Sequence, residues 1–126
     1  MDERAKARER LRQHLERWCN ERLQALGDEL ARNGIPARTN WGGMSWEPCL
    51  VVQVPWSPGE QTVWCRAVAV RVEQGKPVYR WRFVWGDHDV DGLQAITYPA
   101  SDIVRAARMF ANLIEEGREA VANRRR

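Results

Sequence analysis

Residues 61–86, QTVWCRAVAVRVEQGKPVYRWRFVWG, decide the fold, because they have the pattern of a long β-hairpin. β-Branched and aromatic residues alternate with polar or small ones on both sides of the turn at 73–76, Glu-Gln-Gly-Lys. Gly75 can adopt the positive φ that a two-residue hairpin loop requires, and Pro77 opens the second arm where no ladder donor is needed. We therefore predict an antiparallel sheet built around this hairpin.

A loop at Gln74-Gly75 also sets which residues lie opposite each other. One face then carries four residues of each arm, and these are Val70, Val68, Arg66 and Trp64 opposite Tyr79, Trp81, Phe83 and Trp85. The other face is small and basic, with Ala69, Ala67 and Cys65 opposite Arg80, Arg82 and Val84. We expect helices to cover the first face over Trp64, Trp81, Phe83 and Trp85, since that much exposed aromatic surface would promote aggregation.

Helical periodicity on both sides of the hairpin predicts those helices. Apolar residues recur every three or four positions across 2–33, and Asn33-Gly34-Ile35-Pro36 is a helix stop. A second helical pattern follows Ser101 or Asp102, either of which can cap it. Between the helices, 49–54 (CLVVQV) predicts one more strand, and 37–46 a short irregular strand or a tight turn.

The predicted fold is a single α+β domain spanning 1–126, with 1–8 and 123–126 frayed. It consists of a long N-terminal helix, an antiparallel β-meander of three to four strands and a C-terminal helix. Both helices pack on one face of the sheet. The order of these elements resembles that of type III secretion chaperones, and the resemblance implies a dimeric module that binds a protein partner.

Composition indicates a cytoplasmic protein that does not enter a membrane. The chain has 126 residues, of which 44% are hydrophobic and 29% charged, with a formal net charge of +3. No apolar run approaches the roughly 18 residues of a membrane span, and the N-terminus is charged where a signal peptide would be apolar. Cys19, Cys49 and Cys65 have no close spacing, so we expect reduced core residues.

An acidic run after the hairpin is the strongest metal signal. Asp87, Asp89 and Asp91, followed by Gly92, resemble the first half of an EF-hand calcium loop. The twelfth position of that loop falls on Tyr98 instead of a glutamate. A metal-dependent enzyme that uses the three aspartates is therefore the third hypothesis, behind two that require no cofactor.

Basic residues suggest a nucleic-acid-binding accessory protein as the alternative function. The candidate contacts are the arginines of the hairpin and of the C-terminal tail, Arg80, Arg82, Arg124, Arg125 and Arg126. In a regular strand, however, Arg80 and Arg82 lie on the face opposite the aromatic residues. One surface would then be unable both to stack bases and to hold phosphates.

The abundance of tryptophan favours protein binding. Seven tryptophans are more than a small core easily hides, and tryptophan is enriched at protein interfaces. With two histidines and no nucleophile motif, the sequence favours a non-enzymatic interaction module, an adaptor or chaperone-like protein that forms a homodimer. The predicted partner-binding residues are Leu11, Leu15, Trp18, Trp41, Trp46 and Trp56.

Overall fold

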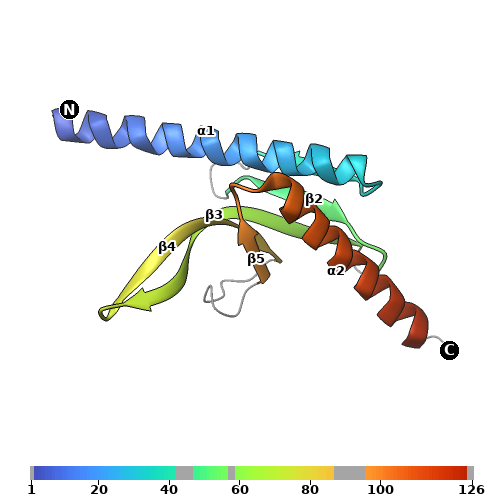
Figure 1. Ribbon diagram of the computed structural model, residues 1–126. Helices are drawn as coiled ribbons and strands as arrows, with labels where there is room; N and C mark the ends of the chain where they lie inside the picture. The colour runs from blue at the N-terminus through green and yellow to red at the C-terminus, as the bar shows by residue number, and fades with distance from the viewer. Residues whose placement is uncertain (1, 42–46, 57–58, 87–95, 125–126) are drawn as a thin grey trace.

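The computed structural model describes residues 2–41, 47–56, 59–86 and 96–124. In chain order its elements are α1 (Glu3–Arg32), β1 (Ala37–Asn40), β2 (Cys49–Gln53), β3 (Glu60–Glu73), β4 (Lys76–Trp85), β5 (Ile96–Pro99) and α2 (Ile103–Arg124). The strands form one antiparallel sheet in sequence order, and the two helices pack against it (Figure 1). The predicted α+β fold is confirmed, with five strands in place of three or four.

The ends of both helices follow from their sequences. At the end of α1, the N–H of Gly34 donates to the carbonyl of Ala31 and that of Ile35 to Leu30, each at 3.0 Å. These two bonds form a Schellman motif, which requires the φ of +78° that Gly34 adopts. At the start of α2, the carboxylate of Asp102 accepts from the N–H of Arg105, so Asp102 is the cap.

The core lies between the helices and one face of the sheet. Phe83 and Phe110 are its largest fully buried side chains, and leucines and valines from α1, β2 and β3 surround them, namely Leu23, Leu26, Leu30, Leu50, Val52 and Val63. Trp85 stacks on Phe110 of α2 with ring centroids 5.3 Å apart. A Cβ on Gly27 would lie 2.9 Å from Leu50, so this glycine allows α1 to approach β2 closely.

The hairpin turn is as predicted, but the register of its arms is not. Gln74 and Gly75 adopt φ of 51° and 75°, as a two-residue loop of type I′ requires, and Glu73 pairs with Lys76. The register then shifts between Ala69 and Arg71, where a β-bulge interrupts β3. Between the bulge and the core, each β4 residue therefore lies opposite a β3 residue one position earlier than predicted.

The bulge exchanges the two faces of β3 relative to β4. Cys65, Ala67 and Ala69 now lie opposite Phe83, Trp81 and Tyr79 on the aromatic face, and Trp64 and Arg66 share the other face with the β4 arginines. The prediction that Trp64 lies beneath the helices was therefore wrong. Phe83 and Trp85 do pack in or against the core, whereas Trp81 is 36% exposed.

Candidate protein-binding surface

The β3–β4 hairpin extends far beyond its neighbours in the sheet. β2 pairs with β3 only from Glu60 to Val63, and β5 pairs with β4 only from Arg82 to Trp85. Within the described residues, 67–73 and 76–81 therefore form a two-stranded ribbon. An isolated two-stranded ribbon is marginally stable in water, so this part of the hairpin depends on whatever packs against its face.

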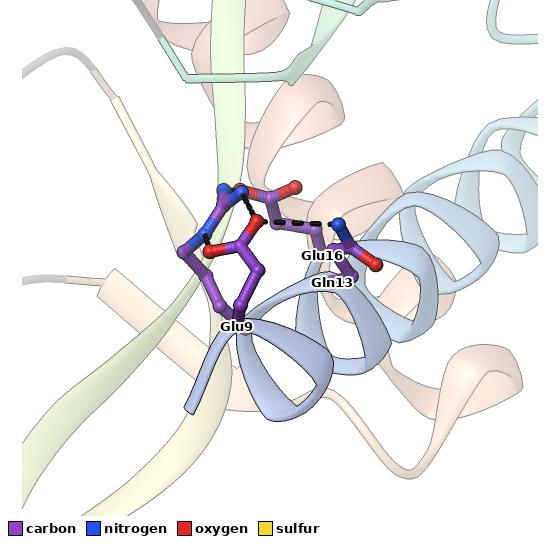
Figure 2. Close-up of polar contacts among 4 residues, drawn as sticks. Glu9, Gln13 and Glu16 are labelled. Carbon is purple, nitrogen blue, oxygen red and sulfur yellow. Dashed lines mark hydrogen bonds and ion pairs between the residues drawn. The ribbon is translucent and has the colours of Figure 1, made fainter. Parts of the chain in front are cut away.

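The N-terminal half of α1 also extends beyond the sheet, toward the same end of the molecule as the hairpin tip (Figure 1). This half of the helix buries no side chain fully: its buried residues begin at Leu23. Its exposed face instead carries a group of polar contacts (Figure 2). Arg12 bonds to Glu9 and Glu16, and Gln13 donates to Glu9 at 3.2 Å. Contacts between residues three and four apart stabilise a helix that receives little tertiary support.

The projecting helix and the projecting hairpin touch at two tryptophans. Trp18 of α1 meets Trp81 of β4 edge to face, with ring centroids 5.9 Å apart. Leu11 and Leu15 lie on the same side of α1 as Trp18, because they precede it by two turns and one turn. Tyr79 lies on the same face of β4 as Trp81, since the two are separated by one residue.

These residues form what we call the open aromatic surface. It comprises Leu11, Leu15 and Trp18 of α1 together with Ala67, Ala69, Tyr79 and Trp81 of the hairpin. Leu11 is 59% exposed and Tyr79 57% exposed, which is unusual for large apolar and aromatic side chains that share one side of a small domain. Trp18 and Trp81 close the inner end of this surface, where it joins the core.

Among the described residues, no strand pairs with the hairpin edge that lies beside this surface. The carbonyl of Trp81 accepts from the N–H of Ala100 at 3.1 Å, so the backbone of Trp81 points toward the β5 side. By alternation, the N–H and C=O of Tyr79 point the same way, beyond the last residue that β5 covers. Pro77 lies on this edge too, in a position where its missing N–H costs no ladder bond.

Two of the other predicted partner-binding residues, Trp41 and Trp56, lie apart from the open aromatic surface. Trp41 is 51% exposed and borders a shallow groove along the polar side of α1, from Gln13 to Asp28. Trp56 packs against the core and on Gly117 of α2. Trp46 lies outside the described residues. Of the six, the structure brings together Leu11, Leu15 and Trp18.

The candidate nucleic-acid residues occupy two distant places. Arg80 and Arg82 lie on the outer face of the hairpin with Arg66, whereas Arg124 ends α2 at the opposite end of the molecule (Figure 1). Arg125 and Arg126 lie outside the described residues. Because of the bulge, Trp64 does share a face with the arginines, contrary to the expected separation of aromatic and basic residues.

The hairpin arginines of this outer face already have partners within the chain. The guanidinium of Arg66 lies 4.6 Å from the centre of the Trp64 ring and bonds to Glu47 at 2.9 Å. Arg82 donates to the hydroxyl of Thr97 at 2.7 Å. A phosphate would have to compete with these contacts for both guanidinium groups.

The metal hypothesis falls on a segment that is not described, because Asp87, Asp89 and Asp91 lie within 87–95. Within the described ranges, no group of three His, Cys, Asp or Glu side chains is placed to hold a metal ion.

In the same ranges, neither helix is both long and apolar enough to cross a membrane. Comparisons with protein-family models, with curated proteins and with solved structures found no match for this chain.

Sequence reasoning missed Tyr79 and Trp81 as parts of an exposed surface, because it assigned the whole aromatic face to the core, and it placed Ala67 and Ala69 on the opposite face. A usable signal was the length of the hairpin. Its arms of 14 and 10 residues exceed strands of four and five residues on either side, so the neighbouring strands cannot extend along the whole of it.

Proposed function

We propose that this protein is a non-enzymatic protein–protein interaction module and that it forms a homodimer through the open aromatic surface. The observation that carries the proposal is the exposure of Leu11, Tyr79 and Trp81 on two elements that project to the same end of the molecule. Large apolar side chains gathered in this way mark interaction sites.

A second copy is the occupant that fits this surface best. In a two-fold dimer, each copy buries its apolar residues against the same residues of the other copy, so neither patch stays exposed to water. Pairing would also cover the apolar face of the two-stranded ribbon, which gains little stability from the rest of its own chain. We further propose an adaptor or chaperone-like role in the cytoplasm, since three cysteines without close spacing do not indicate the disulfide framework of a small secreted protein.

Charge gives this dimer a distinctive salt dependence. Basic residues outnumber acidic ones both on the N-terminal half of α1 and on the projecting hairpin. Two copies that meet through apolar contacts would therefore bring like charges together, and added salt screens that repulsion. Self-association through this surface should strengthen as salt is raised, whereas binding of an acidic protein or a nucleic acid should weaken.

Sedimentation of single-site variants tests the proposal. Leu11→Glu and Tyr79→Glu each place a charge on the open aromatic surface at a position more than half exposed, so the monomer fold should survive. Val104→Glu is the matched control, because Val104 is 53% exposed on α2 and outside this surface. At about 100 μM, where an interface of about −8 kcal/mol is almost fully formed, we expect wild type and Val104→Glu to sediment as dimers and the other two as monomers. A monomeric wild type would overturn the homodimer.

A nucleic-acid-binding accessory protein remains the alternative. Its support is the row formed by Arg66, Arg80 and Arg82 beside Trp64 on the outer face of the hairpin. The internal contacts of Arg66 and Arg82 place it second. A metal-dependent enzyme that uses Asp87, Asp89 and Asp91 is third and would be recognised by metal binding that disappears when those aspartates are replaced.

A further inference from the structure

Two of the three cysteines meet where α1 crosses β3. Cys65 is buried in the core, and Cys19 is half-buried and packs against the same core cluster. The two thiols are in hydrogen-bonding contact. Residues 19 and 65 are far apart in the sequence, so their spacing gives no indication of this pair.

The surrounding packing holds both thiols in place. Trp18, the neighbour of Cys19, contacts Trp81, and Trp81 pairs across the sheet with Ala67, which lies on the same face as Cys65. Cys49 is on the opposite face of the sheet, because Leu50 and Val52 of the same strand point into the core. Only Cys19 and Cys65 are therefore positioned to react with each other.

The two thiols differ in access and in acidity. The hydrogen bond from Cys65 lowers the pKa of Cys19, whereas the pKa of Cys65 is raised by that same bond and by burial. Cys19 is thus both the more exposed thiol and the one that ionises first, and ionised thiols are the nucleophiles in disulfide exchange.

We propose that Cys19 and Cys65 form a reversible disulfide that ties α1 to β3, with a small-molecule disulfide as the oxidant. The Cys19 thiolate attacks one sulfur of the oxidant, forms a mixed disulfide and releases one small thiol, which takes up the proton that Cys19 lost. Cys65 then loses its proton and attacks the Cys19 sulfur, which releases the second small thiol. The protein loses two protons and two electrons, and the oxidant gains both and becomes two thiols.

The bond would act on the element that carries the open aromatic surface. Cys19 lies on the turn of α1 that also holds Trp18, so the disulfide would lock that turn onto the hairpin. It would also close a long loop of the chain, which restricts the unfolded state. The pair therefore couples the thiol redox state of the surroundings to the stability of the junction between helix and hairpin. It does so whether or not the surface binds a second copy.

Thiol counting on the full chain tests this proposal. The folded protein is incubated with oxidised glutathione, denatured in an alkylating reagent, and analysed by mass spectrometry. Reduced protein should give three alkylated cysteines, and oxidised protein one, with a peptide linking Cys19 to Cys65. Cys49→Ser should still form the link, whereas Cys65→Ser should stop at a persistent glutathione adduct on Cys19.

Three outcomes of the thiol count would contradict the disulfide. Three alkylated cysteines after oxidation, a link that involves Cys49, or a stable glutathione adduct on Cys19 of the wild type would each overturn the proposal. Circular dichroism of each serine variant shows whether it is folded. If Cys65→Ser is not, Cys65→Ala replaces it, since alanine leaves no hydroxyl in the core.

Discussion

At the scale of single residues, burial along β4 identifies which aromatic side chain supports the fold. Phe83 is fully buried opposite Cys65, whereas Trp81 is partly exposed. We expect Phe83→Ala to cost about 3–5 kcal/mol of unfolding free energy, the usual range for a core phenylalanine, and Trp81→Ala to cost clearly less. Chemical denaturation of both variants measures the difference. A larger loss for Trp81→Ala would contradict the assignment of Phe83 to the core and of Trp81 to its edge.

Gly117 gives a second prediction at this scale. A Cβ at this position would lie 2.4 Å from the ring of Trp56, although alanine normally favours a helix interior over glycine by about 1 kcal/mol. Gly117→Ala should therefore destabilise the wild type, because the ring must move. In a Trp56→Ala background the same change should stabilise the protein by about 1 kcal/mol. The same sign in both backgrounds would show that the ring does not rest on this glycine.

At the scale of elements, the polar contacts of Arg12 should maintain the N-terminal half of α1. The hydrogen bond from Arg12 holds the pKa of Glu9 below its usual range. A lowered carboxyl pKa contributes helix stability that is present above the unfolded pKa and is lost as pH falls through the folded one. Wild-type helicity, measured by circular dichroism, should therefore fall on acidification. Arg12→Ala should lower the helicity at neutral pH and reduce the further change, and an acid response equal to that of wild type would contradict this role.

The elements also show how much of the fold the sequence predicts. The helix stop at Gly34 and the turn at Gln74-Gly75 follow from local backbone preferences, so both were predictable. The bulge was not, because the alternation through Ala69 and Arg71 continues without a glycine or a proline to mark it. One inserted residue was enough to exchange the faces of a long strand. β5 was missed because it has only four residues and ends at Pro99.

At the scale of the whole molecule, the outer face of the hairpin yields a prediction about nucleic acid. Since Arg66 and Arg82 are engaged by Glu47 and Thr97, we expect no tight, salt-sensitive binding of RNA or DNA. Electrophoretic mobility shifts across a salt series measure this directly. A shift that weakens steeply with salt and disappears in an Arg80→Ala, Arg82→Ala double variant would favour the alternative function.

The candidate surface was half predictable. Leu11, Leu15 and Trp18 follow from helical spacing on an arm longer than a small sheet can cover. The hairpin half, with Tyr79 and Trp81, depends on how far β2 and β5 extend along their neighbours. The length of the hairpin indicates that they stop short of its tip, but no local pattern encodes where they stop. The contact between Trp18 and Trp81, which joins the two halves, is a tertiary feature.

The protection of Trp81 in solution tests the central claim most directly. In fluorotryptophan-labelled protein at about 100 μM, a soluble paramagnetic agent broadens the fluorine resonance of each accessible tryptophan. If two copies pair through the open aromatic surface, Trp81 should be protected in wild type and broadened in Leu11→Glu. Trp41, which is exposed outside this surface, should be broadened in both. Equal broadening of Trp81 in the two proteins would contradict the account.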